Sequence, residues 1–429
     1  MYIQLDVGWL RHPFPTSSFK LTSADQIHQL RSLGVPQIRY VPAKSDPSED
    51  ELVRQIDAQP RDGSPVPAPS SPMEPPLSGE APVALTGISA LRARRLAALA
   101  LVNAQRVAVE RCDQRFSEVT RGYQQLMAKL PSDPREARSL ADSLVGSRVA
   151  EVLDNRDSAI QLLSQGVGVQ PEMHSVNVMV LSLLLGRALG LQRDDLLDIG
   201  KAALLHDVGK HALPLHVAEP GTPLSPLDVQ RYRSHVAESV NAVRRMGLPG
   251  AVQVAIAQHH EMADGSGFPL GLRAEDLSRA GQIVALVNHY ERACNPLHGD
   301  PALTPHEALS VIYAQHKMRF DAVVLGAFIR MMGVYPPGSV VQLANDRYAL
   351  VMSVNSSRPL RPRVLVHDPH VPKDEAVVID LETLPELGIR RSLRPSQLPR
   401  DALDYLAPRQ RICYFFERAA EPSSGEAAP

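Results

Sequence analysis

Histidines gather in the middle of this chain, with a spacing that could build a metal site. His174 opens a stretch in which Val178, Leu181 and Leu185 follow at four, seven and eleven residues, so a helix here would carry the histidine on its apolar, inward face. The same periodicity in "DIGKAALLHDVGK" and "VQRYRSHVAESV" places further histidines on inward faces. The candidates are His174, His206, Asp207, His235, His259 and His260.

Two of these histidines are neighbours in the sequence, which limits where they can lie. Adjacent residues of a helix point about 100° apart, so His259 and His260 can converge on one centre only near a helix end. Gly265 and Gly267 in "HHEMADGSGFP" supply such an end. The two glycines act either as a helix stop alone or by letting the backbone approach a ligand.

A metal ion is the simplest partner for so many inward polar groups. A lone histidine on an apolar face is more often a core residue than a ligand, but five imidazoles and a carboxylate are costly to bury without a shared partner. His235 belongs to this set because Val229 and Tyr232 begin the helical stripe on which it lies. Neutral imidazole and carboxylate together suit zinc, iron, manganese or nickel, and a carboxylate can bridge two ions. We therefore predict a metal site in this region.

These residues also carry a family resemblance. "HDVGK" (206–210) resembles the signature of the HD phosphohydrolase superfamily, and "HHEMADGSGFP" (259–269) is similar to the "HHE…DGSGYP" element of its HD-GYP branch. The resemblance covers roughly 140–330, and the two motifs in this order are highly specific. Residues 1–45, with "LDVGWLRHPF" and "FKLTSADQIHQLRSLG", resemble the short N-terminal domain often found before HD-GYP modules.

The resemblance implies a bacterial cyclic di-GMP phosphodiesterase in second-messenger signalling. It would use two or three divalent transition-metal ions (iron, manganese, nickel or zinc) and give linear pGpG, with GMP as a further product. Asp207 would bridge the ions and Lys210 would contact a substrate phosphate, which makes them the catalytic pair; an ordinary lysine favoured at a helix C-terminus is the alternative for Lys210. The implied metal ligands are His174, His206, Asp207, His235, His259, His260 and Asn288. The implied substrate-binding residues are Lys210, Gly265, Gly267 and Phe268.

One implied ligand departs from the family's pattern. Where the family has an aspartate in an "A-D-x-Y-D" context, this sequence reads "VNHYE", with Asn288 at the aspartate position. An amide carbonyl can coordinate a metal but brings no negative charge, so we expect weaker metal binding there. A shift of register that recruits His289 or Glu291 is an alternative. Otherwise Glu291 is expected either in solvent or hydrogen-bonded to a ligand residue.

Further differences bear on metal number and on substrate. Gln170 stands four residues before His174, where three-metal members have a glutamate, and Glu172 is out of phase, so two metals are expected. The basic "RPYR"-like stretch of many members is absent, and Arg292 is the candidate to replace its guanidinium. Phe268 replaces the family's tyrosine, which removes a hydroxyl hydrogen bond worth about 0.5–1.5 kcal/mol net.

Two other functions stay open on the sequence. One is a catalytically decayed HD-GYP module that regulates by binding cyclic di-GMP or protein partners, which Asn288, Gln170 and the missing basic stretch favour. The other is an enzyme for a different nucleotide or phosphoester. "DGSGFP" argues against the last function, because general HD phosphohydrolases need no such segment.

The whole chain has the pattern of a multidomain protein in which an all-α HD-type domain is flanked by two smaller domains. Alternation in "YIQLDVGWL" and "QIRYVPA", with a helix at 23–34, predicts a small α+β N-terminal domain. The long helix that follows a Pro/Ser-rich linker either packs on its own domain or serves as a connector or dimerising helix. The predicted parts are 1–45 (α+β domain), 46–86 (disordered linker), 87–134 (long helix), 135–332 (HD-GYP-like helical domain without convincing strands), 333–418 (small β-rich domain) and 419–429 (disordered tail).

Composition narrows the classes of partner. A net charge of −2 gives no electrostatic case for DNA or anionic membrane. Three widely spaced cysteines argue against a disulfide framework and favour the cytoplasm. The longest apolar run, around 178–185, is far shorter than the roughly 20 residues that span a bilayer, so no membrane insertion is expected. The expected partners are cyclic di-GMP, signalling proteins and a second copy in a homodimer.

Overall fold

The computed structural model divides the chain into two compact units, residues 1–101 and 102–429. It describes 2–4, 18–20, 39–40, 83–154, 158–166, 172–219, 222–296, 301–355, 358, 360–384 and 387–418, with side chains from residue 96 onward. The predicted helix at 23–34, most of the predicted linker and the predicted tail lie outside the described residues. Among the helices of the described part, none is both long and apolar enough to cross a membrane.

The first unit contains a small antiparallel sheet. Its strands are β1 (Tyr2–Gln4), β2 (Ser18–Lys20) and β3 (Arg39–Tyr40), in the order β2-β1-β3. Ile3 of β1 lies opposite Phe19 on one side and Tyr40 on the other. Strands β1 and β3 fall within the two segments for which alternation predicted strands.

A long helix, α3 (Val83–Lys129), begins in the first unit and ends in the second. It starts four residues before the predicted residue 87. From Cys112 onward its apolar positions are buried at three- to four-residue intervals, through Phe116, Val119 and Tyr123. The following helix, α4 (Pro134–Asp154), buries a small residue about every fourth position, which suits close packing against α6 and α5. The C-terminal half of α3 therefore packs on the unit to which it belongs.

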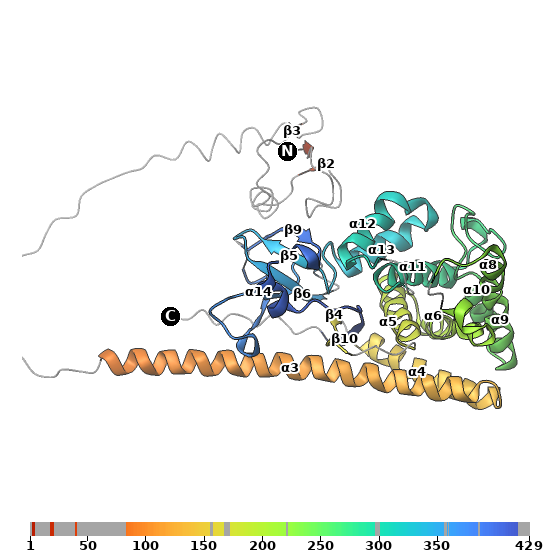
Figure 1. Cartoon of the computed structure of the whole chain (residues 1–429), viewed down its shortest axis with the longest axis horizontal. Coiled ribbons are helices and arrows are strands. Elements are labelled where there is room, and N and C mark those ends of the chain that lie inside the picture. Colours follow the sequence, from red (N-terminus) through yellow and green to blue (C-terminus); the bar gives the residue numbers. More distant parts are fainter. Residues whose placement is uncertain are drawn as a thin grey trace, which may run out of the picture. The chain divides into compact units, whose positions relative to one another are not determined.

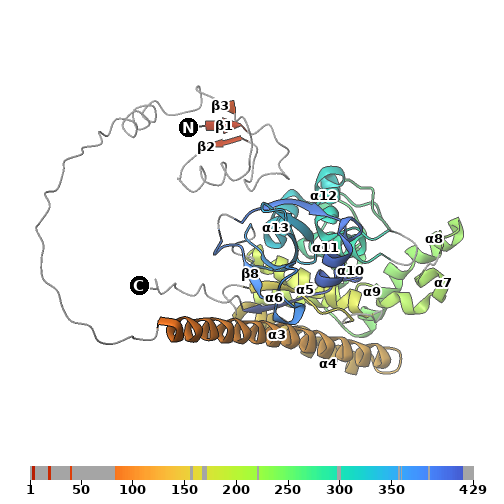
Figure 2. The ribbon, with the colours of Figure 1, turned by 60° about the vertical axis from the view of Figure 1, so that its left-hand side comes forward.

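Helices build the body of the second unit (Figure 1). The central one, α5 (Met173–Ala188), is buried on every side from Met173 to Gly186, as expected of a helix that is apolar all round. It lies beside α6 (Arg193–Leu205) and α11 (Arg279–Cys294) in both views (Figure 1 and Figure 2). Further helices are η3 (Val208–Ala212), α7 (Leu215–Ala218), α8 (Pro226–Arg233), α9 (His235–Arg245), α10 (Gly250–Ala257), α12 (Pro305–Gln315), α13 (Ala322–Met332) and α14 (Arg400–Leu406).

A seven-stranded antiparallel sheet completes this unit. One edge of β6 pairs with β5 in its first half and with β4 in its second half, while the opposite edge pairs with β7. The path β10-β4-β6-β5-β9 is extended from β6 by β7 and then β8. The strands are β4 (Ser158–Leu162), β5 (Val340–Leu343), β6 (Tyr348–Asn355), β7 (Arg363–Val366), β8 (Val378–Asp380), β9 (Ile389–Leu393) and β10 (Tyr414–Arg418).

The sheet corrects two expectations about 135–332. That region is not free of strands, because β4 lies within it; all five of its residues are buried, so it lacks the alternation that marks a strand in a sequence. The strands from 340 onward also share the helical core, to which Leu350, Phe415 and Phe416 contribute. The predicted boundaries at 134/135 and 332/333 therefore do not separate compact units, since 102–429 forms one.

Candidate metal centre

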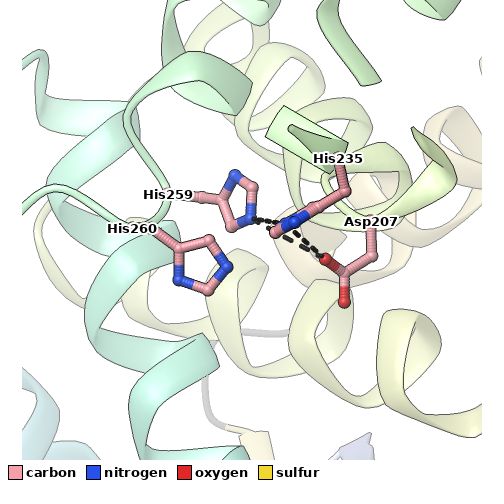
Figure 3. A group of neighbouring side chains, drawn as sticks. All are labelled: Asp207, His235, His259 and His260. Carbon is pink, nitrogen blue, oxygen red and sulfur yellow. Dashed lines mark hydrogen bonds and ion pairs between the residues drawn. The ribbon is translucent and has the colours of Figure 1, made fainter. Parts of the chain in front are cut away.

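The six predicted histidine and aspartate ligands come from the ends of four helices. His174 is the second residue of α5, and His206 and Asp207 connect α6 to η3. His235 is the first residue of α9, and the pair His259 and His260 follows the end of α10. Figure 3 shows four of the six side chains pointing toward one another. The helix end expected for the paired histidines is therefore present.

His235 does not lie on the continuous helical stripe that the sequence predicted. The helical stripe expected from Val229 through Tyr232 is interrupted, because α8 ends at Arg233 and α9 begins at His235. Val229 is exposed, whereas His235 is fully buried. The position of His235 comes from the break between the helices, and a continuous periodicity does not explain it.

Gly209 of the "HDVGK" motif lets α9 approach the aspartate. A Cβ atom on this residue would overlap the carbonyl oxygen of His235 and the backbone nitrogen of Ser239. The backbone N–H of Gly209 donates to the Ser239 hydroxyl at 2.8 Å. The absence of a side chain at this one position therefore brings His235 within reach of Asp207.

Asp207 is shared between two clusters of ligand atoms. On one side, its Oδ1 lies 3.3 Å from His235 Nε2 and 3.7 Å from His259 Nε2, and His260 completes the cluster. On the other side, its Oδ2 lies 3.5 Å from His174 Nε2 and 3.4 Å from His206 Nε2. Within each cluster the candidate ligand atoms all lie within 4.8 Å of one another. A carboxylate between two such sets is suited to bridge two cations.

Hydrogen bonds fix the orientation of four of the imidazole rings. Three histidines donate from Nδ1 to the carbonyl oxygen three residues earlier: His206 to Ala203 at 2.8 Å, His235 to Tyr232 at 2.5 Å and His259 to Ile256 at 2.6 Å. His174 donates from Nδ1 to Glu291 Oε2. A hydrogen on Nδ1 of a neutral ring leaves the lone pair on Nε2. Metal-binding histidines in proteins usually show this arrangement.

The four Nε2 atoms meet in pairs at the centre. His174 and His206 bring theirs to 3.1 Å, and His235 and His259 bring theirs to 3.2 Å. Two nitrogen lone pairs at this separation repel each other, and neither ring has a second hydrogen with which to relieve the contact. A cation that accepts both lone pairs removes the repulsion. These donors, nitrogen and carboxylate oxygen, suit divalent transition metals.

Two unpartnered atoms support the same interpretation. Asp207 Oδ1 and His260 Nε2 are both buried and have no hydrogen-bond partner. Buried polar atoms are nearly always satisfied, so an unsatisfied oxygen and nitrogen in one cluster need a partner of another kind. The described residues therefore fit a metal ion on chemical grounds as well as by geometry.

The protonation states also favour cation binding. Burial lowers the pKa of His206 and, more strongly, the pKa values of His259 and His260, so these rings stay neutral and keep their lone pairs. Burial alone would raise the pKa of Asp207, but the neighbouring Lys210 ammonium group holds that pKa well below its usual range. The centre thus combines neutral imidazoles with an ionised carboxylate.

Glu291 is part of the support of this centre. It is 1% exposed, so the expectation that it lies in solvent is wrong. One carboxylate oxygen accepts from His174, and the other accepts from Asn295 Nδ2 at 2.9 Å. Burial alone would raise the pKa of Glu291, but His174 offsets this and the pKa falls below its usual value. Glu291 therefore orients His174, which agrees with the expectation that it is hydrogen-bonded to a candidate ligand residue.

Asn288 lies on the same helix, one turn earlier. It is buried, and its Oδ1 has no hydrogen-bond partner. The neighbouring His289 packs its ring against His316 and Phe320, which gives no support to a register shift onto His289. Coordination of a metal ion by Asn288 stays a prediction. The unpartnered Oδ1 atom is free to take this role.

The glycine-rich segment forms a turn behind the histidine pair. Gly265 has a φ of +80°, which favours glycine, and a Cβ on Gly267 would collide with the backbone of His260 and Glu261. The Phe268 ring stacks on the His260 ring, with centroids 4.4 Å apart and planes 19° apart. Of the four predicted substrate-binding residues, Gly267 and Phe268 thus contact the histidine pair itself, and Gly265 shapes the turn behind it.

A cavity of about 580 Å³ opens beside the centre, within the range of small-molecule sites. Lys210 and Arg292 line it, and both contact Asp207 Oδ2, at 2.5 and 3.0 Å. Gly265, Gly267 and Phe268 are not among the residues that line it. Glu172 also lines the cavity and has a buried Oε2 without a partner, whereas Gln170 lies outside the described residues.

Sequence reasoning missed two asparagines and an arginine. Asn177 and Asn295 are 0% and 5% exposed and contact Glu291, and Arg411 lines the cavity. The asparagines left a signal in their spacing, since Asn177 follows His174 by three residues and Asn295 follows Glu291 by four, which are same-face positions on a helix. No local pattern marks Arg411, because its place depends on contacts between distant segments.

Comparison with known proteins agrees with the sequence motifs. A family model described as "HD domain" matches residues 150–324, and one described as a domain of unknown function (DUF3391) matches residues 1–139. The second match extends through the linker and the long helix, well past the predicted boundary at residue 45.

Named relatives cover different shares of the chain. A Pseudomonas aeruginosa protein named cyclic di-GMP phosphodiesterase is 26% identical over 370 residues, 85% of this chain and 82% of the relative. The cyclic di-GMP phosphodiesterase PdeB of Borreliella burgdorferi is 22% identical over 192 residues, 45% of this chain and about half (51%) of the relative. A solved structure of an HDG"Y"P protein from Bdellovibrio bacteriovorus shares 22% identity with a TM-score of 0.41, over 50% of this chain and 69% of that one.

Residues 150–324 match the HD-domain family model, and the chain is similar over most of its length to a protein named cyclic di-GMP phosphodiesterase. Both findings agree with the two sequence motifs.

Proposed function

We propose that this protein is a metal-dependent phosphodiesterase that hydrolyses cyclic di-GMP to pGpG, with GMP as the alternative end product, in bacterial second-messenger signalling. The observation that carries the proposal is the pair of clusters that share Asp207, with inward Nε2 lone pairs, beside a cavity lined by Lys210 and Arg292. Relatives named cyclic di-GMP phosphodiesterases support the substrate. A cytoplasmic location is part of the same proposal.

The proposed cofactor is a pair of divalent ions, iron, manganese, nickel or zinc. One cluster would hold an ion with His235, His259 and His260, and the other with His174 and His206, while Asp207 contributes to both. When bound, two such ions supply Lewis-acid stabilisation of the charge that develops on a phosphodiester.

The protein's own side chains would bind the substrate phosphate and keep the candidate metal ligands in place. Lys210 and Arg292 bring two positive charges to the cavity wall, where a phosphodiester carries its negative charge. Glu291 keeps the His174 ring in one orientation, and Phe268 does the same for His260. Such fixed groups stabilise a reacting phosphate without reorganising during the reaction.

The test is hydrolysis of cyclic di-GMP by purified protein reconstituted with Mn²⁺, Fe²⁺ or Ni²⁺. We expect conversion to pGpG by chromatography, metal content near two ions per chain, and loss of both in Asp207→Ala. A fully metallated protein without turnover would overturn the proposal.

A second candidate is a decayed module that binds cyclic di-GMP without hydrolysing it. The uncharged Asn288 at a predicted ligand position favours it, because it brings no negative charge to the centre. Binding of cyclic di-GMP to the metallated protein, measured by calorimetry without accompanying turnover, would distinguish this candidate from the enzyme.

A further inference from the structure

One cation at the cavity comes from the far end of the chain. Arg411 precedes β10 and lines the same cavity as Lys210 and Arg292. Its side chain is exposed, and it forms no ion pair or hydrogen bond with any residue that the structure describes. Lys210 and Arg292, in contrast, both contact Asp207. Arg411 is thus a cavity cation whose charge no described acidic group neutralises.

The main chain next to Arg411 is held firmly. Ile412 donates its N–H to Asn295 Oδ1 at 2.8 Å, and its carbonyl oxygen accepts from Asn295 Nδ2 at 2.8 Å and from Asn177 Nδ2 at 3.1 Å. Tyr414 donates its N–H to Asn177 Oδ1 at 3.0 Å. Both asparagines are buried, so water does not compete for these bonds. We call these four bonds the asparagine clamp.

The asparagine clamp is also hydrogen-bonded to Glu291, the residue that orients His174. Asn295 Nδ2 donates to Glu291 Oε1 at 2.9 Å, and Glu291 accepts from His174. The chain of contacts from Arg411 to His174 therefore runs through buried hydrogen bonds. Such a network fixes the start of the Arg411 side chain relative to the centre while its guanidinium stays free for a ligand.

The chemistry of a cyclic dinucleotide needs such a group. The molecule carries two phosphodiesters on opposite sides of one ring, and only one of them can occupy the metal centre at a time. The other keeps its negative charge in the cavity and needs a cation that the centre does not already use. A guanidinium presents a fork of donors that matches a phosphate.

We propose that Arg411 binds the phosphodiester of a cyclic dinucleotide that is not being cleaved, which makes the C-terminal strand region part of the substrate site. This inference rests on the proposed function. It predicts that Arg411 discriminates between substrates with two phosphodiesters and substrates with one.

The experiment compares Arg411→Ala with the wild-type protein on cyclic di-GMP and on bis(p-nitrophenyl) phosphate, which has a single phosphodiester. We expect the KM for cyclic di-GMP to rise about tenfold, equivalent to about 1.4 kcal/mol. We expect kcat, metal content and turnover of bis(p-nitrophenyl) phosphate to stay within about twofold. Arg411→Lys should recover part of the affinity. Arg400→Ala is the matched control, since Arg400 is an exposed arginine of the same region paired only with Asp404.

The outcomes separate the two proposals. Normal hydrolysis of cyclic di-GMP by Arg411→Ala, or an equal loss on both substrates, overturns the role of Arg411 and leaves the proposed function standing. If the wild-type protein has no turnover, equilibrium dialysis with cyclic di-GMP decides: weaker binding by Arg411→Ala supports the inference without the enzyme. A wild-type protein that neither binds nor hydrolyses cyclic di-GMP overturns both.

Discussion

At the scale of single residues, the centre depends on partners outside its own ligand set. Asp207 supplies one oxygen to each cluster, and the Nδ1 hydrogen bonds decide which lone pairs point inward. Three of these bonds go to backbone carbonyls, which no substitution can remove. The fourth goes to the Glu291 side chain, so Glu291 is the point at which the centre can be altered selectively.

Replacing Glu291 by glutamine should weaken one metal site and spare the other. The amide loses the negative charge that orients His174, and changes of this kind typically cost about 10- to 100-fold in metal affinity. Metal titration of the Glu291→Gln protein should show this loss at the His174 site only. Glu307→Gln is the control, since Glu307 pairs with Arg394 outside the centre. Equal loss at both sites would contradict the assigned role.

Replacing Asn288 by aspartate tests the predicted ligand. If the unpartnered Oδ1 coordinates a cation, the added charge should tighten metal binding by about tenfold, or about 1.4 kcal/mol, and raise the Tm of the metal-loaded protein. If it does not, a buried and unpaired carboxylate should destabilise both the loaded and the metal-free protein. Thermal melts in both states separate the two results.

At the scale of elements, helix ends and close approaches build the site. His174, His206, His235 and the histidine pair lie at or just beyond helix ends, where neighbouring side chains can converge. Gly209 removes the steric barrier between η3 and α9. The HD motif needs its glycine for this contact.

Gly209→Ala should therefore displace α9. Overpacking of this kind costs about 1–3 kcal/mol of stability and should also lower the affinity of the cluster that contains His235. Gly146→Ala is the matched control, because nothing lies within 4 Å of its Cβ position in α4. That change should raise the free energy of unfolding by about 0.5–1 kcal/mol. Denaturant unfolding and metal titration measure both effects, and an unchanged His235 cluster in Gly209→Ala would contradict this account.

Some structural elements could be predicted from the sequence, and others could not. Most of the candidate ligands left a local pattern in the sequence, either a motif or an apolar periodicity. His235 did not, because the helical stripe that predicted it is interrupted between α8 and α9. Strand β4 was not predictable, because a uniformly buried run of five residues has no alternation to distinguish it from part of a helix. The contact of Asn295 with Ile412 was not predictable either, because it joins segments 117 residues apart and no local rule pairs them.

At the scale of the whole molecule, buried histidines link stability to acidity. Burial lowers the pKa values of His206, His259 and His260, and it lowers the pKa of His289 to about 4. These groups titrate near 6.5 when unfolded, so below that pH the unfolded chain binds more protons than the folded one. The contribution of these neutral histidines to the free energy of unfolding is fully present above about pH 6.5 and is lost as the pH falls below that value.

The metal-free protein should therefore melt at lower temperatures as the pH falls from 7 to 5. The metal-loaded protein should lose more, because protons compete with the cation for the same imidazoles. Scanning calorimetry with and without chelator measures both curves, and His289→Leu should flatten the metal-free one. A melting temperature that does not change across this range would contradict the burial of neutral histidines.

The pairing of β4 with β10 and β6 sets an order of events during synthesis. Strand β4 leaves the ribosome early, yet its partners end at residues 355 and 418. The clamp on Ile412 and Tyr414 forms equally late. Until β10 is made, the edge of β4 opposite β6 has no partner, and unpaired strand edges of this kind promote aggregation. A message cut short before codon 414 would therefore yield a product prone to aggregation, although every candidate ligand of the centre had already been translated.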